Sequence, residues 1–226
     1  DFGEKMSDLS SKLQRKRKLA LNELVMTEEK YVNHLRDLID QFMIPLEADV
    51  RREKEGKQRG HILKEVYIVT MFSVIKQILA LNMQLLYDLQ KIDPDDPDFR
   101  VGKVMRPVVP YMKLYKVYCS NHNKAMALVE RCTSTKRKFA IFVREILNDP
   151  NKTNQQLQSL LIMPIQRIPR FKMLLERLLE STPETHVDFD DLTHSLKAVT
   201  YVVDVSLKYH LNYSNENSQT DTSRTT

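Results

Sequence analysis

The sequence has little glycine. Its 226 residues include four, Gly3, Gly56, Gly60 and Gly102, and no two of them can form the closely spaced backbone turns that cradle a phosphate. Walker loops, dinucleotide-binding loops and kinase glycine-rich loops are therefore excluded. A chain so poor in glycine also lacks the turns that many short strands need, whereas its many Leu, Met, Glu, Lys and Arg residues favour helix. The composition predicts an all-α protein.

Cysteine is equally scarce. The two present, Cys119 and Cys132, cannot form a disulfide framework and lack the paired spacing of a zinc site. The six histidines show no metal-binding spacing with cysteine or glutamate. Cys119 and His122 share a helical turn, but a thiol and an imidazole often fall at that separation by chance. We therefore expect a reducing, cytoplasmic location and no metal, cofactor or catalytic acid and base.

Long apolar runs and strong net charge are also missing. The longest uncharged run, residues 153–166, is partly polar and contains proline, so no membrane-spanning segment is expected. Lys and Arg number 35 against 30 Asp and Glu, giving a net charge of +5. That mild excess, without interleaved aromatics, argues against nucleic acid as a partner. The one tight basic cluster, Arg15 to Lys18, fits either a contact with anionic lipid or a solvated helix start.

Apolar periodicity predicts a series of amphipathic helices. We expect an N-terminal extension over residues 1–13 and a disordered polar tail over residues 214–226. Pro45 should end the first helix, and the Asp-Pro-rich stretch 93–98 should be a strong break. The expected helical segments are residues 11–43, 61–92, 99–132 in two pieces, 135–147, a short turn at 157–163, residues 164–180, and a last helix ending near Tyr213. An exposed loop with a helical start is expected over 49–60.

Glu28 departs from the pattern of the first helix. It lies near the centre of an apolar stripe that runs from Leu38 on one side to Val25 on the other. Either this seam is open and a partner protein docks against the carboxylate, or the stripe frays there, or a buried arginine pairs with Glu28.

A second departure lies in the helix over 164–180. Gln166, Arg170, Met173 and Arg177 are separated by four, three and four residues, which places them on one ridge beside the apolar face. Arginine and methionine are enriched at protein interfaces, so this ridge fits a protein-binding strip; a solvated face with incidental charges is the alternative. Arg167 points into the apolar face instead, where we expect its side chain either to extend its charged end to solvent or to pair internally, rather than to contact a ligand.

Three segments resemble the Dbl-homology domain of Rho-family guanine nucleotide exchange factors. They are LNELVMTEEKYVNHLRDL at 21–38, VGKVMRPVVPYMKLYKVY at 101–118 and LQSLLIMPIQRIPRFKMLLERLLEST at 157–182. The third, with its string PIQRIPRF, is similar to the faciogenital-dysplasia-related branch. The resemblance covers about residues 14–212 and implies a Dbl-homology domain over 14–213, folded as an elongated helical bundle.

The resemblance also implies a mechanism and a site. It implies exchange of GDP for GTP on a Rho-family small GTPase of the Rac or Rho type, without bond chemistry by the factor itself. Glu28 matches the family's glutamate that holds switch I of the GTPase. Gln166 and Arg170 match positions that meet switch II, and Met173 and Arg177 extend the same ridge. Leu207 stands where the family often has an asparagine.

Two further expectations concern the chain's surroundings. It begins at Asp1, so we expect a piece of a longer protein, recruited to a membrane or the cytoskeleton through a neighbouring domain. The alternative function is a helical scaffold or adaptor that binds a GTPase or another protein without accelerating exchange.

Overall fold

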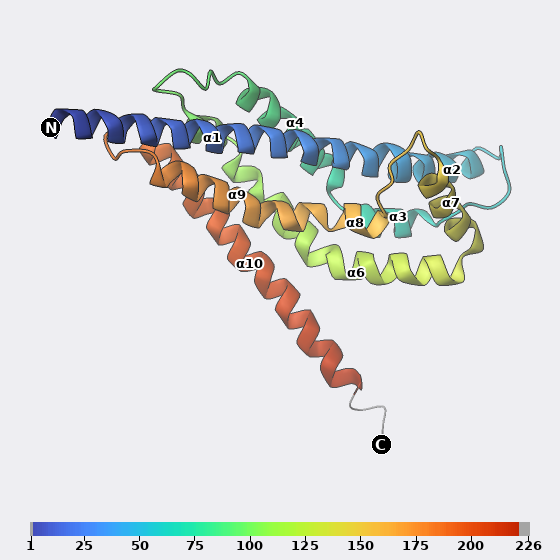
Figure 1. Cartoon of the computed structure of the whole chain (residues 1–226). Helices are drawn as coiled ribbons and strands as arrows, with labels where there is room; N and C mark the ends of the chain where they lie inside the picture. The colour runs from blue at the N-terminus through green and yellow to red at the C-terminus, as the bar shows by residue number, and fades with distance from the viewer. Residues whose placement is uncertain (1, 222–226) are drawn as a thin grey trace. The chain divides into compact units, whose positions relative to one another are not determined.

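The computed structural model describes the backbone of residues 2–221 and the side chains of residues 8–205, and within this range every regular element is helical (Figure 1). The all-α expectation is confirmed. The chain divides into two compact units, which we describe separately. Unit 1 contains residues 1–32, 80–113 and 166–204, and unit 2 contains residues 33–79, 114–165 and 205–226. The domain boundaries expected from the sequence stay a prediction.

Unit 1 is built from two long helices and shorter pieces. It contains most of α1 (Phe2–Asp37) and α9 (Met163–Glu180), the end of α4 (Ile75–Gln90), all of α5 (Val101–Met105), a 3-10 turn (Val109–Met112), and the first half of α10 (Phe189–Asp221). Within it, α1 runs alongside α9 (Figure 1). The apolar stripes predicted from the sequence are buried, including Leu21 and Leu24 on α1 and Phe171, Leu174 and Leu178 on α9.

The aspartate-rich break in unit 1 forms as predicted. The carboxylate of Asp93 accepts a hydrogen bond from the backbone N–H of Asp95, and that of Asp96 accepts one from Asp98, each at 2.9 Å. These are the local turns that aspartate favours. The region after the break has three helical pieces instead of two, because the turn at Pro110 separates α5 from α6 (Lys113–Thr135).

In unit 2, the helical run continues through Pro45, which corrects a sequence prediction. The sequence predicts a break there, but a π-helical turn (Leu38–Met43) leads directly into α2 (Ile44–Lys54). Pro45 occupies the first turn of α2, where its missing N–H costs no hydrogen bond. The stretch 49–60 has the expected helical start, since α2 continues to Lys54 before the loop begins.

The expected helix over 61–92 is also divided. It forms α3 (Glu65–Phe72) and α4, interrupted at Ser73, whose φ of 47° is the one positive value for a non-glycine residue in the described backbone. Unit 2 is completed by α6, α7 (Arg137–Asn148), α8 (Leu157–Leu161) and the loops between them. Phe42, Phe72 and Phe139 are fully buried in this unit.

One stretch is more apolar than the sequence analysis expects, since no membrane-spanning segment is predicted there. Residues Glu65–Gln90, with a mean hydropathy of 1.6 in their most apolar window, meet the length and composition of a span. The sequence estimate missed it because Lys76 interrupts the uncharged run. The stretch is two helices, and its residues Ile68, Phe72 and Ile78 are core residues. Because only 33% of the most apolar window is buried, core packing accounts for part of its apolar character.

The helix α10 has helical backbone to Asp221, beyond the expected end near Tyr213. The predicted disorder of 214–226, like the proposed role of position 207, concerns residues whose side chains lie outside the described part of the chain. Both stay predictions.

Candidate protein-docking site

The strip predicted on α9 is exposed. Gln166, Arg170, Met173 and Arg177 all have exposed side chains, with Met173 at 40%. An exposed methionine beside two half-exposed arginines is a composition found at protein interfaces.

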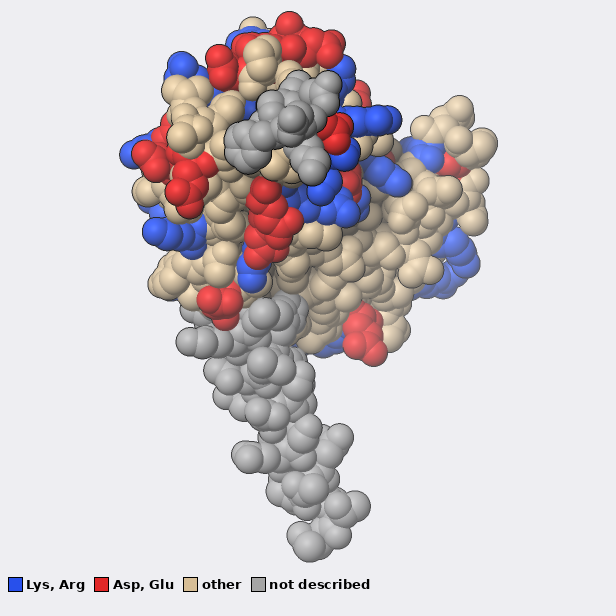
Figure 2. All heavy atoms as spheres, turned by 60° about the vertical axis from the view of Figure 1, so that its left-hand side comes forward, with Lys and Arg blue, Asp and Glu red and all other residues tan. Residues whose placement is uncertain are grey.

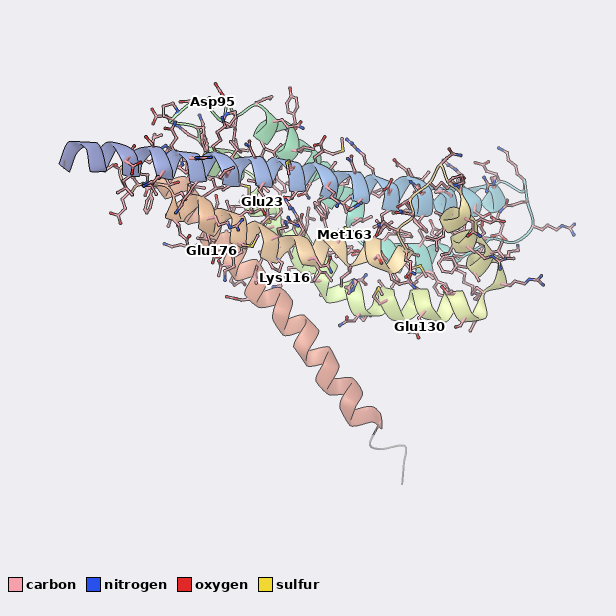
Figure 3. All side chains as sticks on the ribbon, viewed as in Figure 1. Glu23, Asp95, Lys116, Glu130, Met163 and Glu176 are labelled. Carbon is pink, nitrogen blue, oxygen red and sulfur yellow. The ribbon has the colours of Figure 1, made fainter. Side chains whose placement is uncertain are left out.

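Glu23 on α1 is joined to both arginines of this strip. Its Oε2 lies 2.7 Å from Nη1 of Arg177, and its Oε1 lies 3.7 Å from Nη2 of Arg170. Figure 3 shows Glu23 between α1 and α9. The carboxylate therefore forms a hydrogen-bonded ion pair with Arg177 and a longer ion pair with Arg170, and it neutralises part of their charge.

Two further apolar side chains of α1 are exposed near this contact. Leu19 is 61% exposed and Met26 is 66% exposed, and with Glu23 they stand on one ridge at spacings of four and three residues. We call Leu19, Glu23, Met26, Gln166, Arg170, Met173 and Arg177 the α1–α9 surface. The contacts 28–167 and 23–177 show that α1 and α9 are antiparallel here, so the two ridges lie side by side.

A shallow groove continues this surface toward the end of α9. It has a volume of about 390 Å³ and is lined by Lys16, Leu19, Ala20, Glu23, Arg177, Glu180 and Ser181. Its mixture of both charge signs with one leucine suits a polypeptide partner better than a single small ion.

Glu28 is not at the surface, which corrects the expectation that its carboxylate is open to a partner. Its side chain is 0% exposed, and its Oε2 accepts a hydrogen bond from Nη2 of Arg167 at 2.5 Å. Arg167 also donates to Oγ1 of Thr27 at 2.9 Å. The alternative interpretation, a buried arginine paired with Glu28, is the one the structure contains.

Burial governs the protonation of this pair. Loss of water raises the pKa of Glu28 to about 7, while the charge and hydrogen bond of Arg167 oppose that change. Among the described residues, Oε1 of Glu28 and Nε of Arg167 have no hydrogen-bond partner. The guanidinium lies 4.2 Å from the ring centre of Phe171 and 5.6 Å from that of Tyr31, so aromatic faces complete its environment.

The basic cluster Arg15 to Lys18 is not a free cationic field. Arg17 is buried, donating to the backbone oxygens of Pro97 and Phe99 at 3.1 and 2.9 Å, and Lys18 pairs with Asp95. Two of its four cations are thus engaged within unit 1. On the face drawn in Figure 2, charges of both signs alternate with uncharged areas.

Within the described part of the chain, no group of three or more His, Cys, Asp or Glu side chains could hold a metal ion. Cys119 and His122 are both buried, so neither is accessible to a substrate.

Sequence reasoning missed Glu23. The residue shows no irregularity in the pattern of α1, because an acid at the margin of an apolar stripe is ordinary. Its importance depends on which helix lies beside α1, and nothing in the local sequence gives that neighbour.

Residues 20–205 match the RhoGEF domain family. Human intersectin-1 is 30% identical over 195 residues, covering 84% of this chain and 11% of its own length. The human FYVE, RhoGEF and PH domain-containing protein 4 is 33% identical over 182 residues, covering 79% of this chain and 23% of its own length. The chain thus spans a small part of the curated relatives it matches.

Solved structures give the same fold. The DH/PH domains of p115-RhoGEF (R399E mutant) align with a TM-score of 0.74 at 19% identity, covering 88% of this chain and 56% of that one. The DH/PH domains of PDZ-RhoGEF, in complex with GTP-gamma-S activated RhoA, align with a TM-score of 0.72 at 18% identity, covering 87% and 54%.

Proposed function

Because the chain belongs to the RhoGEF domain family, we propose that it is a guanine nucleotide exchange factor for Rho-family small GTPases. The observation that carries the proposal is the α1–α9 surface, where two arginines held by Glu23 stand among exposed methionines. Support also comes from the PDZ-RhoGEF structure, whose DH/PH domains are in complex with RhoA.

The mechanism is stabilisation of one GTPase state over another. The factor binds the nucleotide-free, magnesium-free GTPase more tightly than the nucleotide-bound form, so GDP leaves and GTP enters. A thousandfold acceleration needs about 4 kcal/mol of differential binding. A few charge-assisted hydrogen bonds, at about 1.5 to 3 kcal/mol each, supply that amount. The protein accelerates exchange without making or breaking a bond itself.

The α9 strip binds switch II. Gln166 offers an amide, Arg170 and Arg177 offer forked donors to carboxylates or backbone oxygens, and Met173 adapts to the apolar part of the partner. The proposed role of Glu28 toward switch I requires Arg167 to release the carboxylate when the GTPase docks, since Glu28 is fully covered in the free protein.

The proposal also covers the branch of the family, the location of the whole protein and the type of GTPase. The third segment and the 33% identity to a FYVE, RhoGEF and PH domain-containing protein favour the faciogenital-dysplasia-related branch. The whole protein is cytoplasmic, and a neighbouring domain recruits it to a membrane or the cytoskeleton. The GTPase is of the Rac or Rho type.

Release of a fluorescent GDP analogue from a panel of Rho-family GTPases tests the proposal. Wild type should accelerate release from at least one member, and Arg170→Glu should abolish the acceleration because it reverses the charge at position 170 and leaves the strip without net charge. The matched control is Lys172→Glu, which makes the same charge change on α9 but outside the strip, and it should remain active.

The result also separates exchange from scaffolding. Binding of a nucleotide-free GTPase without faster release, across the whole panel, would establish the scaffold function instead. Equal activity of Arg170→Glu and wild type would show that the partner binds elsewhere.

A further inference from the structure

A second charged surface lies in unit 2 and shares no residue with the α1–α9 surface. Residues 51–65 contain six Lys and Arg against three Glu, and residues 130–138 contain four against one, so each segment carries a net charge of +3. Together these two short segments hold more positive charge than the net +5 of the entire chain. Positive charge is therefore concentrated in unit 2 in a way that the overall composition conceals.

The fold brings the two segments together. A Cβ atom added to Gly60 would lie 3.4 Å from Nζ of Lys138, so the loop after α2 lies against the start of α7. Two residues after the first segment, the ring centre of Tyr67 lies 5.6 Å from the guanidinium of Arg131 in the second segment. In Figure 1, the loop after α2, the end of α6 and the start of α7 gather at one end of unit 2.

Three of the four carboxylates in these segments have a basic side chain as partner, and the fourth, Glu130, is exposed. Glu53 pairs with His61, Glu55 with Lys57 at 2.7 Å, and Glu65 with Lys54 at 2.6 Å. Six exposed cations beside the contact between the two segments form no ion pair with any residue that the structure describes. We call this set the basic corner: Arg59, Lys64, Arg131, Lys136, Arg137 and Lys138.

The position of three of these cations is unfavourable within the protein itself. Lys136 caps the start of α7, and Arg137 and Lys138 form its first turn, which contains no acidic residue. A helix start carries positive partial charge and favours anions, so cations there destabilise the free helix. An anionic partner at this corner would relieve that repulsion.

We propose that the basic corner binds the anionic surface of a membrane. A folded protein partner normally needs an apolar centre with aromatic anchors, and lysine is depleted at such interfaces. Val66 and Val69 on α3 are exposed beside Lys64, but no aromatic side chain within residues 59–69 or 131–138 is exposed, and three of the six members of the basic corner are lysines. An anionic membrane attracts each cation separately, and because its headgroups are mobile the binding needs no complementary protein shape.

The test is cosedimentation of the 226-residue chain with lipid vesicles. Wild type should bind phosphatidylcholine vesicles that contain about one third phosphatidylserine, and should not bind pure phosphatidylcholine. Binding should be lost at about 0.5 M salt, because the attraction is screened. Each surface cation strengthens such binding about fivefold, so Arg137→Gln with Lys138→Gln should weaken it about 25-fold.

The matched control removes the same net charge from unit 1. Lys113→Gln with Lys197→Gln changes two exposed lysines outside both the α1–α9 surface and the basic corner, and should keep wild-type binding. Equal loss in the control would mean that net charge alone drives binding, which would overturn the proposal. Failure of wild type to bind anionic vesicles, or binding only to an acidic polypeptide such as polyglutamate, would also overturn it. GDP release measured without lipid should be unchanged in Arg137→Gln with Lys138→Gln, so this proposal and the exchange function fail or succeed separately.

Discussion

Glu28 on α1 and Arg167 on α9 form an ion pair that has almost no access to water. The side chain of Glu28 is 0% exposed and that of Arg167 is 3% exposed, and the two groups meet at 2.5 Å. The cost of removing two charges from water nearly cancels the attraction between them, but removal of one partner leaves the other charge buried alone. This asymmetry makes the pair sensitive to single substitutions.

At about pH 8, where Glu28 is ionised, Glu28→Ala should therefore lower the free energy of unfolding by about 3 to 5 kcal/mol, because Arg167 would remain as an uncompensated buried charge. Urea denaturation followed by circular dichroism measures the change. The double variant Glu28→Leu with Arg167→Met is the control, and it should lie within about 1 kcal/mol of wild type. If Glu28→Ala unfolds at the wild-type urea concentration, the pair is not buried in solution.

The same pair makes stability depend on pH. Burial raises the pKa of Glu28 from 4.5 to about 7, so the folded state holds this proton more tightly than the unfolded state. Between those two values, the contribution of Glu28 to the free energy of unfolding should fall as pH rises, and it should be constant above about pH 7. Thermal unfolding from about pH 4.5 to about pH 8, for wild type and for the double variant Glu28→Leu with Arg167→Met, isolates this contribution as the difference between the two curves. A difference that does not change with pH would contradict the raised pKa.

Some helix boundaries follow from local residue types, and others depend on the conformation of the neighbouring segment. The Asp-Pro stretch at 93–98 interrupts the helices as predicted, because aspartate and proline act through their own backbone. Pro45 does not end the helical run, since the preceding π-helical turn places it in the first turn of α2. The interruption at Ser73 was missed, because serine carries no helix-breaking signal of comparable strength.

Ser73 is held at φ 47° and ψ −127°, a region that residues with a side chain rarely adopt. Such a conformation costs about 1 to 3 kcal/mol, and glycine avoids most of it. After the extra entropy that glycine loses on folding, Ser73→Gly should raise the free energy of unfolding by about 1 kcal/mol. Ser73→Ala retains a Cβ atom and should give no gain in the same denaturation experiment. A gain in both variants would point to the serine hydroxyl instead of backbone strain.

The approach of α5 to α10 in unit 1 depends on Gly102. A Cβ atom there would lie 2.4 Å from the backbone nitrogen of Leu192 and 2.7 Å from the carbonyl carbon of Asp191. In addition, the carboxylate of Asp188 accepts hydrogen bonds from the N–H groups of Gly102 and Lys103, at 2.8 and 3.0 Å. The two elements are thus held at a distance that leaves no room for a side chain.

Gly102→Ala should consequently destabilise the protein by about 3 kcal/mol, at the upper end of the usual cost of overpacking, since backbone atoms must move. Lys103→Ala, at an exposed neighbouring position, should change stability by less than about 0.5 kcal/mol. Thermal and urea unfolding of both variants measure this contrast. Equal stability of the two would mean that α5 and α10 are farther apart in solution.

On the scale of the whole molecule, two surfaces are assigned to two partners. The α1–α9 surface belongs to unit 1 and the basic corner to unit 2, and they share no residue. Substitutions without shared contacts usually have additive effects. Combining Arg170→Glu with Arg137→Gln and Lys138→Gln should reproduce the loss of exchange of the first and the loss of vesicle binding of the second. Measuring both activities on the single and combined variants tests this, and any exchange defect from the basic corner alone would show that the surfaces are coupled.

The helical class, the ridge on α9 and the inward direction of Arg167 can be predicted from the sequence alone, because helical periodicity fixes which side chains share a face. The three motif segments likewise indicate the RhoGEF domain family. The burial of Glu28, the pairing of Glu23 with two arginines and the packing of residues 59–67 against residues 131–138 follow from the tertiary structure and could not be predicted in this way. The periodicity of one helix describes its own faces, whereas burial and ion pairing depend on the helix that packs beside it, and that neighbour is set by contacts between residues more than a hundred positions apart in the case of α1 and α9.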